Sequence, residues 1–538
     1  MLPFSRRSGS AVAPVTHAIA LLVFASALSA ASAQTSTITA NPATMPRIAT
    51  VDPRFQSFNI EMVEVTGGNF WKPYSKTVDA PATVAPKSSP SNQPIGMDPS
   101  MFHYRSPIDL FNARLRKLAA ALGPTYVRVS GTWQNTTYFQ DSDGPSPAIP
   151  PTGFNGVLTR QEWKGVVDFS IAVNAGIVTS FATSAGTRDA NELWTSDQAA
   201  KFVAYTKSIG GKIAAAEFMN EPTMPSAAGA PKGYNGPAFG RDIAVFVPFL
   251  KKASPDTIIL GPGSVGEGFQ MIPANMGILS SEEMLTATGP AFDALSYHFY
   301  GGVSSRCATM VPGGGTTISA ALTDDWLDRT DVVEAFYAKL RDRFEPGKKM
   351  WLTETAQTAC GGDAWASTFL DSFRYLNQLG TLAQKGVQVV AHNTLAASDY
   401  ALLDSDTFRP RPNYWAALLW SRFMGTTVLD PAVAKTPGVH TYAQCLKNVP
   451  GGVALLVINA NPNSTVEVSV PQRSERYTLS SLEMQGREVL LNGTPLALGQ
   501  DDALPILNGI ATPAGSLTLP PASITFLTLR AVNNSFCK

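Results

Sequence analysis

Two glutamates stand at the ends of short apolar runs that lie far apart in the sequence. The first run, residues 212–222 (KIAAAEFMNEP), is typical of a buried strand with an exposed polar tip, Asn220-Glu221-Pro222. The second, residues 349–355 (KMWLTET), carries Glu354 close to its end. Small apolar residues suit the interior of a parallel sheet, and a proline ends the strand. We expect Glu221 and Glu354 to face each other across one cleft.

Two facing carboxyl groups can supply both groups that hydrolysis of a glycosidic bond requires. One protonates the leaving oxygen, and the other acts as nucleophile or base on the opposite face of the sugar. Carboxyl groups about 5–5.5 Å apart imply a retaining mechanism through a covalent glycosyl-enzyme. The proton donor must stay protonated near the working pH, so we expect its surroundings to raise its pKa.

Three polar residues near the same strand ends are further candidates. Asn220 could hydrogen-bond the 2-hydroxyl of a bound sugar. Tyr300, at the end of the predicted strand 292–300, could donate to Glu354 and hold that carboxylate ionised, although a core position fits it equally well. His298 lies on the same strand, where it fits either a cleft residue or a hydrogen-bonded structural histidine.

The elements that would position these residues alternate between strands and helices. Strands are predicted at residues 55–62, 125–129, 177–183, 212–222, 257–260, 292–300, 349–355 and 387–395. Helices are predicted at residues 108–122, 160–175, 196–209, 239–253, 280–287, 330–344, 365–385 and 413–423. This alternation predicts an α/β fold with a closed (β/α)8 TIM barrel over residues 51–425. Glu221 would then end the fourth strand and Glu354 the seventh, at the rim where this fold places catalytic residues.

The pattern changes beyond residue 425. Short β-rich runs with turn residues between them predict a C-terminal antiparallel β-sandwich over residues 426–538, and residues 34–50 could contribute a strand to it. Residues 67–106 are rich in Pro, Ser and Gly, which indicates a long loop that is either functional or disordered. The sequence does not decide whether that loop closes over the cleft.

The N-terminus has the features of a secretory signal peptide over residues 1–33. Arg6 and Arg7 precede an apolar run at residues 18–28, and Ala31-Ser32-Ala33 offers a cleavage site. The run is short for a bilayer, so we expect export to a secreted or periplasmic location, with a retained anchor as the alternative. After cleavage no membrane association is expected. With 41 basic and 41 acidic residues, the chain does not suit nucleic-acid binding.

Four cysteines in an exported chain allow two disulfides, with three possible pairings. Their spacing fits no zinc site, and no metal is expected. We favour Cys445 with Cys537 inside the C-terminal region, which leaves Cys307 with Cys360 to join two loops beside the cleft. Buried free thiols are the alternative.

Several short motifs together resemble glycoside hydrolase family 79 of clan A, which holds the heparanases and β-glucuronidases. The motifs are TYVRVSGT (125–132), EFMNEP (217–222), SYHFY (296–300), KMWLTET (349–355) with Gly361-Gly362, and NYW (413–415). The resemblance covers most of the chain after the signal segment, including the sandwich.

The resemblance implies a role for each matching residue. Glu221 is then the acid/base, Glu354 the nucleophile, Asn220 the residue beside the acid, and Tyr300 the contact to the nucleophile. Further cleft positions are implied for Glu61 and Thr132. Backbone amides near Gly361 and Gly362, with the hydroxyl of Tyr400, would hold the uronate carboxylate. The pair Cys445 and Cys537 also matches a disulfide in the family's sandwich.

Two departures from the family pattern bear on the substrate. Cys360 stands where relatives have Gly, Tyr or Asn, which affects the expected uronate contacts, and residues 301–325 form a long Gly-rich loop. We find no dense basic cluster for a sulfated polysaccharide, since residues 114–117 fit a solvated helix face.

We therefore predict a secreted retaining β-glucuronidase or heparanase-like hydrolase. It would need no cofactor and would act on a carbohydrate with a uronic acid. A clan A glycosidase for neutral sugars is the nearest alternative, and a non-catalytic carbohydrate-binding protein is a more distant one. Endo or exo action, the exact substrate and the oligomeric state remain open.

Overall fold

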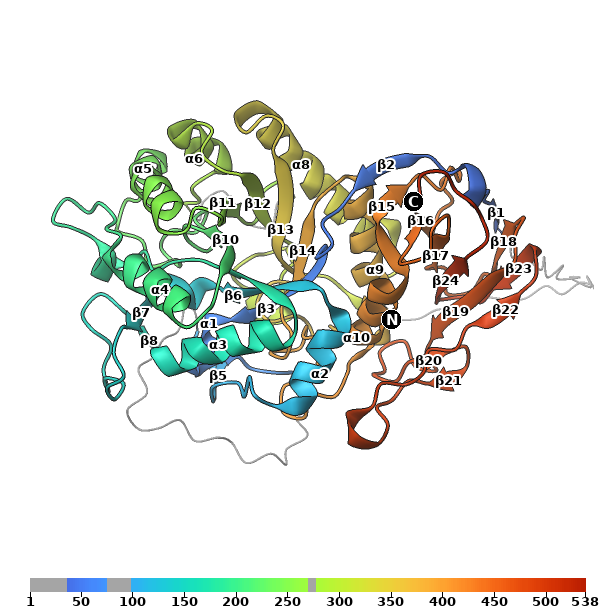
Figure 1. Cartoon of the computed structure of the whole chain (residues 1–538), viewed down its shortest axis with the longest axis horizontal. Coiled ribbons are helices and arrows are strands. Elements are labelled where there is room, and N and C mark those ends of the chain that lie inside the picture. The colour runs from blue at the N-terminus through green and yellow to red at the C-terminus, as the bar shows by residue number, and fades with distance from the viewer. Residues whose placement is uncertain (1–35, 75–97, 270–276) are drawn as a thin grey trace, which may run out of the picture. The chain divides into compact units, whose positions relative to one another are not determined.

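The computed structural model describes residues 36–74, 98–269 and 277–538, and the predicted signal segment lies outside them. Eight parallel strands close into a barrel, in chain order around its circumference (Figure 1). They are β3 (Gln56–Glu61), β6 (Thr125–Ser130), β9 (Ala175–Thr179), β10 (Ile213–Glu217), β11 (Ile258–Ser264), β12 (Ala294–Tyr300), β13 (Lys349–Ala356) and β14 (Val389–His392). The TIM-barrel prediction is confirmed.

Helices between the strands form the outer layer of the barrel (Figure 1). They are α2 (Ala113–Leu122), α3 (Arg160–Ala172), α4 (Asp197–Ser208), α5 (Gly236–Ala253), α6 (Ser281–Thr288), α8 (Arg329–Phe344), α9 (Phe369–Gln384) and α10 (Pro412–Phe423). Because the strands are covered by helices outside and by one another inside, every residue of β3, β6 and β12 is buried.

Short elements decorate the ends of the barrel strands. They are α1 (Met62–Thr66), β4 (Gly68–Trp71), β5 (Phe102–Arg105), β7 (Thr137–Gln140), β8 (Gly156–Thr159) and α7 (Asp324–Leu327). Strands β4 and β5 pair antiparallel. They lie at the two ends of the loop predicted at residues 67–106, whose central residues 75–97 are outside the described part of the chain.

The C-terminal region forms two sheets, as the fold prediction expected. A nine-stranded sheet contains β2 (Arg47–Thr50), β15 (Met424–Leu429), β16 (Val439–Leu446), β17 (Val453–Asn459), β24 (Ser523–Leu529), β19 (Ser474–Ser480), β20 (Leu490–Leu491), β21 (Thr494–Pro495) and β22 (Ile510–Thr512). A three-stranded sheet contains β1 (Ser36–Thr39), β18 (Val466–Val470) and β23 (Gly515–Leu519).

The N-terminal segment supplies two strands to these sheets, where one was expected. Strand β1 runs parallel to β18 in the small sheet, and β2 runs antiparallel to β15 in the large one. In Figure 1 both strands appear in blue beside orange and red neighbours. The chain changes sheets between them at a 3-10 turn that starts at Pro42, whose ring cannot donate a ladder hydrogen bond.

The central strands β17 and β24 of the large sheet are buried on both faces, because each face packs against a different layer. Along β17, Val453 and Leu455 face the core shared with the small sheet, whereas Ala454 and Leu456 belong to the core shared with the barrel. This split follows from the two-residue side-chain period of a strand. The Tyr442 hydroxyl adds a polar contact by donating to Asn377 Oδ1 on α9 over 2.6 Å.

Both disulfides of the favoured pairing are present, Cys307–Cys360 and Cys445–Cys537. The second ties β16 to the C-terminal end of the chain. Of the helices that the structure describes, none combines the length and the apolar composition that a bilayer crossing requires.

The core shared by barrel and sheet should carry much of the stability. Leu456 is fully buried in it, so Leu456→Ala should lower the free energy of unfolding by about 2–5 kcal/mol through lost burial and a residual cavity. Leu482 is 88% exposed, and Leu482→Ala should change it by less than about 0.5 kcal/mol. Urea denaturation followed by tryptophan fluorescence measures both. Equal effects of the two changes would contradict this packing.

Candidate active site

Glu221 lies in the turn that follows β10, and Glu354 lies near the end of β13. The expectation of an exposed tip at residues 220–222 is wrong, since Asn220 and Glu221 are only 1% and 8% exposed. The side chain of Asn135 takes the place of a neighbouring strand there. Its Oδ1 accepts from Asn220 N at 2.8 Å and its Nδ2 donates to Asn220 O at 2.9 Å. The tip is therefore held inside the protein.

A register shift in β13 turns Glu354 toward the interior of the barrel. Leu352 pairs with Tyr297, whereas Glu354 pairs with His298, so Thr353 is an extra residue opposite β12. The Thr353 hydroxyl also points inward, because it donates to Glu217 Oε1 at 2.7 Å. A regular strand would send Thr353 and Glu354 to opposite faces, and a bulge re-aims one of them.

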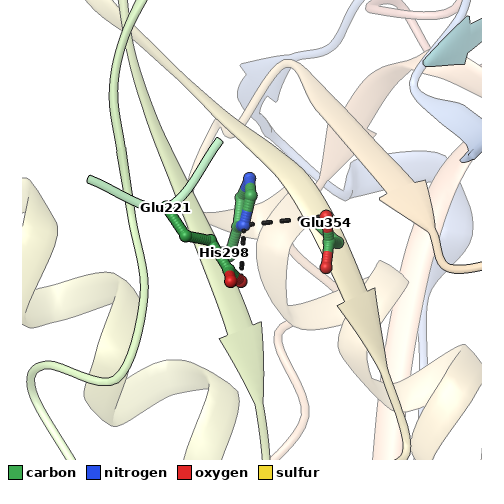
Figure 2. A group of neighbouring side chains, drawn as sticks. All are labelled: Glu221, His298 and Glu354. Atoms are coloured by element: carbon green, nitrogen blue, oxygen red, sulfur yellow. Dashed lines mark hydrogen bonds and ion pairs between the residues drawn. The ribbon is translucent and has the colours of Figure 1, made fainter. Parts of the chain in front are cut away.

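The two glutamates meet at one place. A carboxylate oxygen of Glu221, one of Glu354 and a ring nitrogen of His298 all lie within 4.8 Å of one another. Figure 2 shows one ring nitrogen of His298 facing both carboxylates. This upper limit on the distance between one oxygen of each carboxyl group is compatible with the spacing of about 5–5.5 Å in retaining glycosidases and is shorter than the 6.5–9.5 Å or so of inverting ones.

Arg128 of β6 lies behind the pair and is 1% exposed. Its Nη1 donates to Glu354 Oε2 at 2.8 Å, and its Nε donates to Glu217 Oε2 at 3.0 Å. Its Nη2 also donates to Asn220 Oδ1 at 2.8 Å. Burial is the strongest influence on Glu217 and alone would raise its pKa, but the charge of Arg128 together with hydrogen bonds such as that from Thr353 outweighs burial and lowers that pKa. Glu217 therefore remains an anion and balances Arg128.

The tautomer of His298 follows from its neighbours. Arg128 can only donate, so the contact of 3.2 Å from its Nη2 makes His298 Nε2 an acceptor. His298 Nδ1 then carries the proton and donates to Glu221 Oε1 at 3.1 Å. Burial lowers the pKa of His298 to about 4, so the ring is neutral. Both ring nitrogens are engaged, and this trio is not set up to bind a metal ion.

Glu221 has the properties of a proton donor. Burial raises its pKa to about 7, with the charge of Glu217 adding to the rise and that of Arg128 opposing it. Glu354 has two donors in contrast, Arg128 and the hydroxyl of Tyr300, which donates to Glu354 Oε1 at 2.6 Å. The two carboxyl groups are therefore suited to different roles.

A second cluster of polar side chains surrounds Asn393, just beyond the end of β14. Asn393 Nδ2 lies 3.0 Å from Glu61 Oε1 and 3.1 Å from the hydroxyl oxygens of both Tyr300 and Tyr400. Burial, followed by the charge of Glu61, raises the pKa of Tyr400 well above its usual range, so its phenol keeps its proton. These groups offer hydrogen bonds to a ligand without a full positive charge.

Glu61 and Glu64 are two further buried carboxyl groups. Burial raises the pKa of Glu61 well above its usual value, and the charge of Glu354 adds to the rise. Glu64 Oε1 accepts from Glu61 N at 3.0 Å, and burial raises the pKa of Glu64 to about 7. Gly131 makes room for Glu61, since a Cβ there would lie 1.5 Å from Glu61 Oε2.

The carboxylate pair opens into a cavity of about 160 Å³ at the C-terminal ends of the barrel strands. Six residues expected at the site line it: Glu61, Thr132, Glu221, Tyr300, Glu354 and Tyr400. Asn220 and His298 lie behind the wall in the Arg128 network. Gly361 and Gly362 are not on the wall, although a Cβ on Gly362 would lie 3.2 Å from Tyr400 Cβ. Their contact to a ligand remains a prediction.

Three residues of the site were not singled out from the sequence: Arg128, Glu217 and Asn393. Arg128 and Glu217 did carry a signal, because each is a charged residue inside an apolar run that was predicted to be a buried strand. A charge in such a place must have a buried partner. Asn393 had only its position near the end of the eighth predicted strand.

Comparisons with known proteins give related sequences over most of the chain, although no family model matches. Heparanase-like protein 1 of Arabidopsis thaliana is 25% identical over 493 residues, which cover 80% of this chain and 86% of that protein. Heparanase of Mus musculus is 29% identical over 487 residues, covering 80% and 88%. Baicalin-beta-D-glucuronidase of Scutellaria baicalensis is 34% identical over 195 residues, covering 34% and 37%.

Solved structures share the fold. A GH51 arabinofuranosidase from Xanthomonas axonopodis pv. citri superimposes with a TM-score of 0.57 at 16% identity, covering 92% of this chain and 99% of that one. A 4-O-alpha-L-rhamnosyl-beta-D-glucuronidase from Fusarium oxysporum gives 0.57 at 13% identity, covering 91% and 100%. At these identities the likeness concerns the fold alone.

The buried Glu64 should make stability depend on pH. Its folded-state pKa of about 7 lies above the value of 4.5 for a free glutamate, so its contribution is present below about pH 4.5 and is lost as pH rises through 7. When the pH rises from 5 to 8, the free energy of unfolding should therefore fall less for Glu64→Gln than for the parent. The difference between the two decreases should be roughly 3 kcal/mol at most. Urea denaturation at both pH values measures this.

The control for this comparison is Glu483→Gln, which alters an exposed carboxylate and should follow the parent. If Glu64→Gln also follows the parent, the buried carboxyl of Glu64 does not set the pH dependence.

Proposed function

Because its relationship to heparanases and heparanase-like proteins over most of its length places the chain in glycoside hydrolase family 79, we propose that it is a retaining β-glucuronide hydrolase. The observation that carries the proposal is the meeting of Glu221 and Glu354 in one cavity, with carboxylate oxygens no more than 4.8 Å apart. Their different surroundings support two different roles.

In the first step, Glu221 acts as the acid and Glu354 as the nucleophile. The carboxyl proton of Glu221 passes to the glycosidic oxygen while the bond from C1 to that oxygen breaks. A carboxylate oxygen of Glu354 forms an ester bond to C1 from the opposite face. The donors from Arg128 and Tyr300 hold Glu354 in its orientation for this attack.

In the second step, water attacks C1 and Glu221 now acts as the base. The carboxylate of Glu221 accepts the proton of the water, the ester bond to Glu354 breaks, and the sugar leaves with its β configuration retained. His298 serves as a positioning residue, because its Nδ1–H fixes Glu221 Oε1 and leaves Oε2 to exchange the proton. Each residue returns to its starting protonation state.

The glucuronide part of the proposal rests on the names of the relatives and on the donors around the cavity. Two relatives carry the names heparanase and baicalin-beta-D-glucuronidase. The phenol of Tyr400 and the amides near Gly361 and Gly362 are neutral donors that can hold a carboxylate. A neutral sugar is the second candidate, because no lysine or arginine is found among the described residues that line the cavity.

We also propose that the chain is exported. The predicted signal segment at residues 1–33 and the two disulfides support a secreted or periplasmic location.

The sugar preference can be measured with two aryl substrates that share a leaving group. The 4-nitrophenyl β-glucuronide should be hydrolysed with a kcat/KM at least tenfold above that of the β-glucoside. Glu354→Gln should reduce kcat by more than about 10³ for the preferred substrate, because it removes the nucleophile. A preference for the glucoside would overturn the uronate assignment, and an active Glu354→Gln variant would overturn the role of Glu354.

The proton donor should control the alkaline side of the pH profile. Glu221 must be protonated for the first step, and its pKa is about 7, so kcat/KM should fall about tenfold per pH unit above pH 7. Glu221→Gln should lose this limb. This variant should lower kcat/KM for phenyl glucuronide by a factor of about 10²–10⁴. It should lower kcat/KM for 2,4-dinitrophenyl glucuronide far less, since that leaving group needs little protonation.

The expected contrast between the two leaving groups has a simple counter-result. If Glu221→Gln slows both substrates equally and keeps the alkaline limb, another group donates the proton.

A further inference from the structure

The wall of the active-site cavity differs in polarity around the barrel. Glu61, Thr132 and Tyr400 belong to the ends of the first, second and eighth strands, and they offer polar atoms. Apart from Glu221 and Tyr300, the side chains that line the cavity from the fourth, fifth and sixth strands and the loops after them are apolar. Met224 follows β10, Val265 follows β11, and Met310 and Val311 follow β12. Trp71 and Trp133, from the loops after the first and second strands, also line the cavity. The side with Glu61, Thr132 and Tyr400 therefore combines polar atoms with aromatic rings and suits a sugar, whereas the other side is mainly apolar.

Glu221 marks where the leaving group must begin. The proton donor has to lie beside the glycosidic oxygen, and Glu221 belongs to the same turn as Met224 and Ala227, which also line the cavity. A leaving group that is bonded to this oxygen extends from Glu221 along the apolar side. Met224, Ala227 and Met310 are half-buried there, so they still have apolar surface that a ligand can cover.

The loop after β12, which forms part of the apolar side, is held in place by covalent and backbone contacts. The loop after β12 is joined to the loop after β13 by the disulfide Cys307–Cys360, and both cysteines line the cavity. Backbone bonds reinforce the joint, since Ser304 N donates to Ala359 O at 3.1 Å and Ala359 N donates to Gly302 O at 2.9 Å. Met310 and Val311 are therefore held in place as a preformed apolar surface, which lowers the cost of binding.

Charge also separates the possible ligands. The loop at residues 301–325 after β12 contains one arginine, Arg306, but its Nη2 pairs with Asp399 at 3.1 Å and its guanidinium stacks over Tyr74 at 4.1 Å. Arg128 is engaged by Glu217 and Glu354. The described lining of the cavity offers acids, neutral polar groups and apolar groups but no cation. A sulfated sugar beside Glu221 would lose hydration without gaining an ion pair.

We propose that the leaving-group side of the cavity, formed by Met224, Ala227, Val265, Met310, Val311 and the Cys307–Cys360 disulfide, binds an uncharged aromatic aglycone. The enzyme then acts as an exo-hydrolase on small aryl glycosides and does not accept a sulfated polysaccharide chain. This inference rests on the proposed function for the sugar, but the aglycone surface is a separate feature.

Binding to the Glu354→Gln variant tests the inference. Because this variant should not turn over the substrate, differences in leaving-group reactivity do not affect the measurement. Calorimetry with methyl, phenyl and 2-naphthyl β-glucuronides should give affinities that rise at least threefold at each step, because each aglycone covers more apolar surface. A sulfated oligosaccharide with a terminal glucuronate should bind more weakly than the methyl glucuronide. Equal affinities for the three aglycones, or tighter binding of the sulfated oligosaccharide than of the naphthyl glucuronide, would overturn the inference.

The same series of β-glucosides separates a failure of this inference from a failure of the proposed function. If the glucosides bind and the glucuronides do not, the uronate assignment is wrong. A rise in affinity from methyl to naphthyl glucoside would then still support the aglycone site, and a flat series would reject it.

A charge placed in the apolar wall provides an independent test. Met310 is half-buried, so a lysine there can keep its ammonium in water. Met310→Lys should weaken the binding of naphthyl glucuronide at least fivefold. It should also reduce the difference in affinity between naphthyl glucuronide and the sulfated oligosaccharide. Ile318→Lys alters an exposed position of the same loop outside the cavity and should change the affinity for neither ligand. Unchanged naphthyl binding in folded Met310→Lys would contradict the proposal, and the aglycone series decides if that variant does not fold.

Discussion

The site depends on one buried cation, Arg128. Removing a guanidinium from water costs several kcal/mol, and the cost is offset only where ion pairs and hydrogen bonds replace the lost hydration. Arg128 has such partners on three other strands or their ends: Glu217 and Asn220 at the fourth strand, His298 on β12, and Glu354 on β13. It thereby fixes the positions of the barrel strands whose ends carry the proposed chemistry.

The network also explains how two similar side chains differ. Glu354 accepts from a guanidinium and a phenol, whereas within the described part of the chain the Glu221 side chain accepts only from the neutral imidazole of His298. Burial therefore dominates at Glu221 and raises its pKa. Because Glu217 balances much of the charge of Arg128, the cation does not cancel this rise. A third glutamate, absent from the cavity wall, thus contributes to the division of roles.

Much of the fold could be predicted because its signals are local. Apolar runs that alternate with segments of helical periodicity predicted the barrel. The change to short β-rich runs beyond residue 425 predicted the C-terminal sheets. Less local features were missed. The two N-terminal strands joined different sheets, since register and sheet membership depend on distant partners such as β15 and β18. The tip at Asn220 was buried because Asn135 paired with its backbone, which no adjacent residue indicates.

The sequence by itself determined which residues could react and on which strands they stood. Glu221 and Glu354, the polar residues around them and the four cysteines were all apparent from residue type and position. Tertiary structure alone decided how these groups were oriented and charged. The shift at Thr353 turned Glu354 into the barrel, and burial beside Arg128 and Glu217 set the pKa of Glu221. Orientation and pKa depend on distances between strands that are remote in the chain, so local pattern does not encode them.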